Sequence, residues 1–347
     1  MKSKKLLKVC KEDEIMIIAV QGTHNESNNS QGAIAMLASL TSSRFQKKTL
    51  ILQLGNPKDI PVESMLGKQF RPKQTFSTTY QFTDKGIDSL LSKTSAKDEK
   101  EVVILTEEHF RKACISVLRD SNQVSVLDVA TSTTVKDFEA GLLQNHKALE
   151  SLLKNAEKHY ECIYVLLPTN VPLVKEILPM VDINIICVPQ AKKQPIEKME
   201  GKKNYVLVAD YEYHSNHNLN AIKKAYDEKK IFAMPHTVDY KDALVDCELL
   251  NFIYSNSKND EVDDNYIFIE NLMKLLKEFI KDEETESRFE DGVIMNFDES
   301  EFPEKEPFVS NANVELAPIT AENFTVETHK SGFLKGKTET SVSFHEE

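Results

Sequence analysis

The chain lacks tryptophan and has few glycines, since only 10 of its 347 residues are glycine. No Gly-x-Gly-x-x-Gly series is present, which argues against a dinucleotide-binding oxidoreductase. A Cys-x-x-Cys pair is also missing. The five cysteines are odd in number and far apart along the chain: Cys10, Cys114, Cys162, Cys187 and Cys247. This pattern favours buried thiols over disulfides.

Long hydrophobic runs are absent as well. No segment reaches the roughly 18 consecutive apolar residues that a transmembrane helix requires, and the start Met1–Lys5 is not followed by the apolar core of a signal peptide. We therefore expect a cytoplasmic protein. The formal net charge of −12 disfavours non-specific nucleic-acid binding by the bulk surface and leaves only the short basic stretch Lys2–Lys11 as a local candidate.

What the sequence does contain is an alternation of apolar runs and helical patterns. The runs rich in Val, Ile and Leu predict strands at residues 15–20, 48–54, 101–105, 122–128, 162–167, 183–188 and 205–209. Helices are predicted at residues 138–159, 172–181, 218–229 and 265–281. Nearly continuous apolar strands are typical of parallel sheets covered on both faces. We expect a three-layer α/β domain over residues 15–281, with a mostly parallel β-sheet flanked by helices.

The composition changes at about Asp282. Residues 282–347 are rich in Asp and Glu and carry isolated aromatic residues rather than apolar runs, which predicts a largely disordered acidic tail. Two interpretations of this tail stay open: a solubilising segment, or linear motifs that dock into a basic, apolar groove of a partner. With a basic lead at residues 1–14, the chain has three predicted parts: 1–14, 15–281 and 282–347.

The most informative segment, Ile15 to Leu40, is predicted to form a strand, a loop and a helix. Nucleotide-binding proteins bind phosphate at a loop between a strand and a helix. A working loop needs glycines, a lysine and a Ser or Thr hydroxyl, and between Gly22 and Gly32 there is neither glycine nor lysine. The loop could still bind an anion through backbone N–H groups at the helix N-terminus. Its candidate residues are Gly22, Thr23, His24, Asn25, Ser27, Asn29, Ser30, Gln31 and Gly32. The alternative is a loop capped by its own side chains, with Asn29 or Ser30 as N-cap.

The order of these segments resembles the ParA/MinD class of deviant-Walker P-loop ATPases, including its CpaE/TadZ-like branch. Five segments carry the resemblance. They are the helix end at Met36–Ala38, the strand Leu50–Leu54, the stretch Ala156–Leu166, similar to a Walker B strand, the stretch Val181–Gln190, similar to the strand after it, and Ile231–His236, similar to a late Ile-Pro turn. Together they span roughly Ile15 to Ile280. The resemblance implies that the region between the early strands and the Walker B strand carries dimer or partner contacts. The alternative is that helices of this region simply cover the sheet.

The charged positions of the resembled class are occupied by neutral or apolar residues here. When this sequence is aligned with the class at the helix end, Asn25 occupies the position of the signature lysine and Ser30 that of the P-loop lysine. Gln31 and Gly32 occupy the positions of the Ser/Thr pair. The acidic residues of the class correspond here to Gln53, Gly55 and Leu166. The asparagine that reads the adenine base in the class corresponds to a position near Asp210. The resemblance with these departures implies a degenerate member with no catalytic residue, no metal ligand and no required cofactor, although ATP with Mg²⁺ remains an alternative.

Two further patterns are open to chemical interpretation. His214 and His217, with Asp210 and Glu212 nearby, suggest either a metal site or general base, or simply a polar loop before a helix. For function, the first hypothesis is a bacterial pseudo-ATPase that acts as a scaffold or regulator in spatial organisation: pilus or secretion-machine placement, or DNA partition. Its tail would recruit protein partners. The alternative is an ATP-binding switch that dimerises with nucleotide.

Overall fold

The computed structural model describes residues 15–23, 27–54, 61–70, 86–94, 104–131, 146–168, 171–190, 193–228, 230–256 and 263–280, and two short strands beyond them. The chain divides into two compact units, Met1–Met295 and Asn296–Glu347. In the second unit, β9 (Val326–Glu327) pairs antiparallel with β10 (Ser341–Val342). The predicted basic lead, and most of the segment predicted as a disordered tail, lie outside the described residues.

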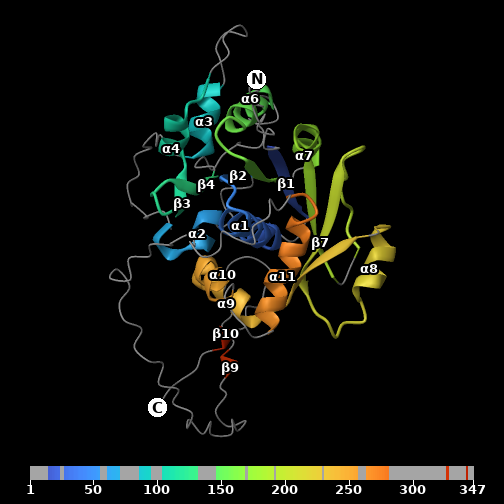
Figure 1. The fold of residues 1–347 in the computed structure, drawn as a ribbon. Helices are drawn as coiled ribbons and strands as arrows, with labels where there is room; N and C mark the ends of the chain where they lie inside the picture. The colour runs from blue at the N-terminus through green and yellow to red at the C-terminus, as the bar shows by residue number, and fades with distance from the viewer. Residues whose placement is uncertain are drawn as a thin grey trace, which may run out of the picture. The chain divides into compact units, whose positions relative to one another are not determined.

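The first unit is built on an eight-stranded sheet (Figure 1). Its strands are β1 (Met16–Gly22), β2 (Thr49–Gln53), β3 (Ile115–Arg119), β4 (Ser125–Thr131), β5 (Cys162–Leu166), β6 (Ile183–Pro189), β7 (Lys203–Tyr211) and β8 (Ile231–Pro235). They lie in the order β3-β4-β2-β5-β1-β6-β7-β8, and every neighbouring pair is parallel except β3 with β4. The predicted α/β fold with a mostly parallel sheet is confirmed.

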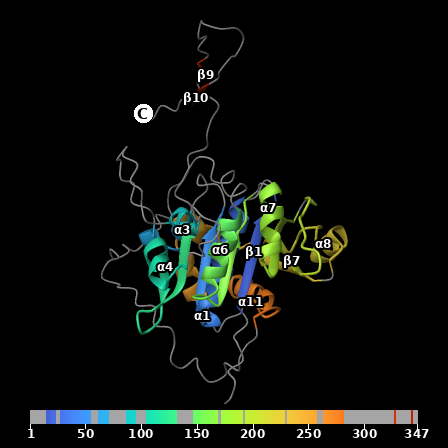
Figure 2. The same ribbon diagram turned by 90° about the horizontal axis from the view of Figure 1, so that it is seen from above.

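Ten α-helices are described in the first unit. They are α1 (Ser27–Arg44), α2 (Val62–Leu66), α3 (Ile87–Thr94), α4 (Glu107–Ala113), α6 (His146–Ala156), α7 (Val171–Ile177), α8 (Leu219–Tyr226), α9 (Val238–Asp246), α10 (Leu249–Asn256) and α11 (Asp264–Leu276). Short 3-10 turns follow α2 and α7 at Lys68–Phe70 and Leu178–Met180. Helices α3, α6 and α7 lie on one side of the sheet, the side facing the viewer in Figure 2, and α1, α9, α10 and α11 lie on the other. This arrangement confirms the predicted three layers.

Most predicted elements are present, with shorter or shifted ends. Four of the departures concern strands. The strand predicted at 122–128 begins at Ser125 instead, because Asp120 Oδ1 accepts from the backbone N–H groups of Asn122 and Val124 and holds a turn there. The hairpin strand β3 was not predicted. Ile104 and Leu105, predicted to end a strand, belong to no strand, while 101–103 lie outside the described ranges. Residues 231–235, similar to a turn in the resembled class, form β8.

Helix predictions differ mainly in length. The predicted helix 138–159 is described only as α6, because residues 138–145 lie outside the described part of the chain. Helix α8 ends at Tyr226 because Asp227 adopts a left-handed conformation, and α11 begins where Asp263 Oδ1 accepts from Tyr266 N. Both helices were predicted. No described helix has the length and apolar character needed to cross a membrane. The described cysteines, Cys114, Cys162, Cys187 and Cys247, are free and buried, as expected.

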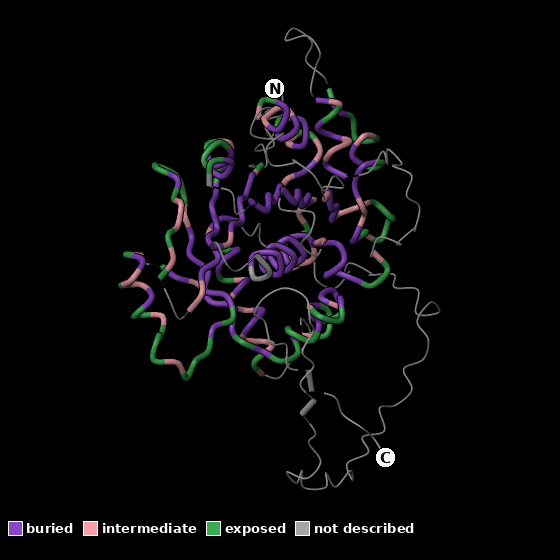
Figure 3. Tube along the Cα trace, turned by 180° about the vertical axis from the view of Figure 1, so that it is seen from behind, coloured by how far each residue is buried: buried purple, intermediate pink, exposed green. Residues whose placement is uncertain are grey.

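Helix α1 is enclosed over most of its length. Every residue from Ser30 to Ser42 is buried, so most of α1 appears as a purple coil near the centre of Figure 3. Small residues allow this, because Ala33, Ala35, Ala38 and Gly32 let neighbouring elements approach the helix backbone closely. An amphipathic pattern is unnecessary for a helix that has no solvent-facing side.

The closest approach to α1 is made by Tyr240 of α9. A Cβ added at Gly32 would lie 2.3 Å from the Tyr240 hydroxyl oxygen and 3.5 Å from Cζ of the same ring. Tyr240 cannot easily move aside, because its ring packs against Phe252 and Phe268 at centroid distances of 5.8 and 4.5 Å. Glycine at position 32 is therefore set by the packing of α9 onto α1.

We predict that Gly32→Ala lowers the free energy of unfolding by about 1–3 kcal/mol, the usual cost of overpacking a core. The measurement is urea denaturation of the full chain. In the Gly32→Ala background, Tyr240→Phe removes the clashing oxygen and should restore most of the loss. If Gly32→Ala is equally destabilising with Phe at position 240, the contact does not determine the residue at 32.

Candidate functional site

The carboxyl ends of the central strands meet at one edge of the sheet. Strand β1 lies between β5 and β6, so the strand order reverses there, and ligands of open α/β sheets bind outside such a point. Strand β1 ends at Gly22 and α1 begins at Ser27, which leaves four residues between them. This is the position of the phosphate-binding loop in P-loop proteins.

The start of α1 corrects the predicted cap. Asn29 and Ser30 lie inside the first turn, so neither is the N-cap, and Ser30 is buried at 3% exposure. The helix begins about a turn earlier than side-chain capping alone would place it. When the spacing Gly-x₄-Gly-Lys-Ser/Thr is counted from Gly22, Ser27 falls at the second glycine, Asn28 at the lysine and Asn29 at the Ser/Thr. This alignment is two residues earlier than the one made on the end of the helix, which put Ser30 at the lysine. Neither register contains a lysine or arginine.

The candidate loop residues fall into three groups. Thr23 and Gln31 are buried, and Thr23 Oγ1 and Gln31 Oε1 have no hydrogen-bond partner among the described residues. Gly22 ends β1, and Gly32 lies beneath Tyr240. Ser27 and Asn29 belong to α1, but their side chains are outside the description, as are His24 and Asn25 altogether. The structure thus brings Gly22, Thr23, Ser30, Gln31 and Gly32 to one end of β1 and α1.

Gln53 and Leu166, which align with acidic residues of the resembled class, have structural roles here. Gln53 ends β2, and its Oε1 accepts from the backbone N–H of Val62 at 2.9 Å, which fixes the start of α2. Leu166 ends β5 and is buried at 3% exposure. Leu166 has no ligand atom for Mg²⁺, and the amide oxygen of Gln53, already bonded to Val62 N, brings no negative charge to a metal ion.

A buried carboxyl group at this edge was missed by the sequence reasoning. Glu63 of α2 is buried; its Oε1 accepts from Thr131 Oγ1 at 2.9 Å, while Oε2 is enclosed without a partner among the described residues. Desolvation raises the pKa of Glu63. The burial thus disfavours the charged carboxylate relative to an exposed glutamate. The one sign of a buried carboxyl group in the sequence was a glutamate within the mostly apolar stretch Val62–Leu66.

The raised pKa of Glu63 gives a prediction with a definite sign. Below the ordinary glutamate pKa of about 4.3 both folded and unfolded chains carry the neutral acid, and as pH rises the unfolded chain loses its proton first. The wild type should therefore lose stability relative to Glu63→Gln as the pH rises above about 4.3. Urea denaturation at several pH values measures the difference.

The matched control is Glu108→Gln on the exposed side of α4. Lys112 donates to Glu108 and lowers the pKa of that carboxyl, so any pH dependence of this variant should have the opposite sign. A Glu63→Gln difference that stays constant with pH would contradict a buried, hard-to-ionise Glu63.

Asp210 is held by its own neighbours at the end of β7. The residue has a left-handed φ of 54°, at the register slip between β7 and β8. Its Oδ1 lies 2.7 Å from His236 Nδ1, and its Oδ2 lies 3.2 Å from Lys241 Nζ. The nearby loop is closed by Gln190, whose Nε2 donates to the carbonyl oxygens of Glu212 and His217. Within the described residues no three His, Cys, Asp or Glu side chains are grouped to hold a metal.

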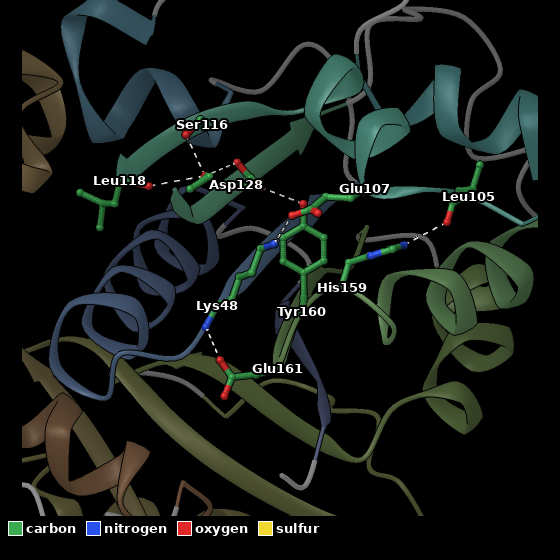
Figure 4. Close-up of polar contacts among 10 residues, drawn as sticks. Lys48, Leu105, Glu107, Ser116, Leu118, Asp128, His159, Tyr160 and Glu161 are labelled. Carbon is green, nitrogen blue, oxygen red and sulfur yellow. Dashed lines mark hydrogen bonds and ion pairs between the residues drawn. The ribbon is translucent and has the colours of Figure 1, made fainter. Parts of the chain in front are cut away.

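A second polar cluster occupies the opposite, amino-terminal edge of the sheet (Figure 4). Asp128 of β4 accepts from Tyr160 OH at 2.8 Å and from Ser125 Oγ at 2.6 Å, and burial raises the pKa of this carboxyl. Lys48 lies over the Tyr160 ring and pairs with Glu107 at 2.7 Å. These contacts join α4 and the β3–β4 hairpin to the start of β5. Their components are spread over 113 residues of sequence, and none was predicted.

Comparison with known proteins agrees with the fold. No family model matches the sequence, and no curated protein sequence matches it. Solved structures do match: a ParA family ATPase from Chlorobium tepidum (TM-score 0.54, 11% identity, 76% of this chain and 99% of that one) and MinD in the MinC:MinD cell division complex of Aquifex aeolicus (0.51, 12%, 77% and 97%). A plasmid partition protein from Borrelia burgdorferi bound to AMPPNP is also similar (0.50, 14%, 77% and 100%).

These similarities identify the fold as that of the ParA/MinD-type P-loop ATPases. Each relative is matched over nearly its whole length, so the first unit contains the complete fold rather than part of it. At 11–14% identity the likeness extends to the fold alone. What the chain does with this fold depends on the residues at the carboxyl edge.

Proposed function

We propose that the chain is a non-catalytic ParA/MinD-like protein that acts as a scaffold or regulator rather than as an ATPase. The observation that carries this proposal is the lack of a cation beside β1 and of an acid at the ends of β2 and β5. The loop and first turn of α1 carry no lysine or arginine, and Gln53 and Leu166 stand at the ends of β2 and β5. Phosphoryl transfer depends almost wholly on positioning and charge neutralisation, so losing these groups together removes the mechanism.

Protein partners are the natural ligands of such a molecule. One solved relative, MinD of Aquifex aeolicus, is seen in a complex with MinC. By that likeness we infer a cytoplasmic role in spatial organisation within a bacterial cell, in pilus or secretion-machine placement or in DNA partition, with dimer or partner contacts made by the α/β unit. The acidic residues 282–347 supply a recruiting arm whose aromatic residues can enter a basic, apolar groove.

We predict that the full chain binds neither ATP nor ADP with Mg²⁺ at 1 mM. Calorimetry and thermal unfolding measure this directly, because a site of about 10 μM affinity would stabilise the fold by about 2.7 kcal/mol at that concentration. No heat and no shift in melting temperature are expected, and phosphate release should equal that of buffer. Saturable binding would contradict the proposal.

A divergent ATP-binding switch is the second candidate. The unpartnered oxygens of Thr23 and Gln31 near the N-terminus of α1 favour it, since they leave hydrogen-bonding capacity where a ligand could be held. This candidate requires nucleotide binding together with dimerisation, which sedimentation of the same samples detects. If nucleotide binds, Asn28→Ala and Asn25→Ala test the two registers of the loop, with Gln190→Ala as a control that touches a different loop.

The tail gives a prediction of its own. Deleting residues 282–347 should abolish recruitment of protein partners and leave the melting temperature of the α/β unit nearly unchanged, because the deleted residues lie beyond α11. The readout is cross-linking in cells followed by mass spectrometry, with the full chain as reference. A truncated chain that keeps its cross-linked partners, or one whose melting temperature falls sharply, would count against a recruiting tail.

A further inference from the structure

Strand β8 is an outer strand of the eight-stranded sheet, and its outer edge pairs with no strand among the described residues. Its parallel pairing with β7 uses the inner edge alone. The residues Ile231–Met234 are uncharged, and the register with β7 slips only beyond Val208, near the end of the strand. An unpaired edge of this kind presents a row of backbone N–H and C=O groups to any extended chain that reaches it.

The opposite outer strand, β3, is protected by its own irregularity. Its pairing with β4 slips twice, between Ser116 and Leu118 and between Leu118 and Arg119, and the strand ends in a charged residue. Bulges and charged side chains are common means by which proteins prevent pairing at a sheet edge. Strand β8 has neither over its first four residues, so a cover for this edge has to come from another segment.

Both faces of β8 are already covered, which leaves the edge as its open side. Ile231 and Ala233 belong to the buried cluster under α8. Phe232 lies on the other face and packs on Tyr205, whose ring also contacts that of Phe279, just after α11. A strand added at this edge extends a sheet that has helices on both sides, so it needs apolar side chains on both of its faces.

The described part of the first unit ends beside this edge. Lys230, directly before β8, pairs with Glu278 at 2.6 Å. The ring centroid of Phe279 lies 5.8 Å from that of Tyr205, which directly precedes the stretch of β7 that pairs with β8. The residues that follow Ile280 therefore start at the amino end of β8.

The sequence beyond Ile280 has the length and the composition that the edge requires. Six of the ten residues 282–291 are acidic and one is basic, and the run Val293–Met295 is wholly apolar. The twelve residues between Ile280 and Val293 reach about 40 Å when extended. The five residues of β8 span about 17 Å, so the apolar run can reach the whole edge.

Lysines around this edge match the charge of the acidic stretch. Lys203 begins β7, and Lys223 and Lys224 lie in the last turn of α8. None of these three takes part in an ion pair among the described residues, whereas Lys198 and Lys230 nearby are paired. A local basic surface attracts an acidic segment that starts beside it, even on a chain with a net charge of −12.

We propose that Val293–Met295 adds to the outer edge of β8 as a further strand of the sheet, here called the capping strand. The acidic residues 282–291 lie over Lys203, Lys223 and Lys224. The occupant is this segment rather than a second copy of the chain, because its short tether from Ile280 gives it a high local concentration at the edge.

The capping strand goes beyond the recruiting role proposed for the tail and does not depend on it, since residues 296–347 take no part in it. It covers backbone groups at the margin of the sheet and does not enter the core. Its loss therefore exposes β8 to pairing with other chains and leaves the rest of the sheet in place.

Hydrogen exchange of the full chain, followed by mass spectrometry, tests the capping strand. Ile294→Pro removes a backbone donor and disrupts the added strand, so protected amides of residues 231–235 should exchange at least tenfold faster than in the wild type. Val314→Pro places the same change farther along the tail and should leave β8 unchanged. Strand β2, inside the sheet, should be unchanged in both variants. Equal exchange of β8 in the wild type and in Ile294→Pro would overturn the proposal.

Two further measurements separate the capping strand from other covers of the edge. Lys203→Glu should speed exchange of β8 two- to fivefold in the wild type and have no effect in the Ile294→Pro background, because Lys203 acts through the docked segment. An equal effect in both backgrounds would contradict this. Protection of β8 should also stay constant when the protein concentration is raised fiftyfold. Protection that grows with concentration would assign the edge to a second copy and overturn the proposal.

Discussion

The parallel pairing of β1 with β5 and β6 is the constraint on which the rest of the first unit depends. Because β1 is central, α1 leaves its carboxyl end at the middle of the sheet and is covered by α9, α10 and α11. A helix in that position is buried over most of its length, so small residues are needed where a neighbouring element approaches its backbone, as Tyr240 does at Gly32. The same geometry places the carboxyl edge, with Gln53, Glu63 and Leu166, around the loop that follows β1.

The sequence predicted the parts of the fold that depend on local patterns. Continuous apolar runs identified β1, β2, β5, β6 and β7, because a strand covered on both faces has no polar side. Strand β3 was missed because Ile115–Arg119 is short, lies at the sheet edge and is half-exposed along much of its length. The start of α1 was placed too late because only the capping preferences of Asn29 and Ser30 were weighed, and both residues lie inside the first turn.

The polar sites depended on contacts that no local pattern contains. The lack of a lysine between Gly22 and Gly32 and the identity of Leu166 could be read directly from the sequence. The environment of Glu63 could not be read, because its pKa depends on enclosure and on Thr131, 68 residues away. The hydrogen bonds among Gln21, Asn184 and Asn204 left one trace, Asn184 within the apolar run Ile183–Val188, because their three side chains come from neighbouring strands.

The central place of β1 also affects how the chain reaches its fold. Backbone N–H of Ile17 is bonded by Asp182, 165 residues later, so the first strand made by the ribosome is among the last to find its neighbours. At typical synthesis rates this delay is about 10–30 s. During that interval β1 and the enclosed α1 expose apolar surface without a sheet to cover them. Parallel pairing between strands so far apart in the sequence is slow and leaves this surface open to aggregation while the pairing forms.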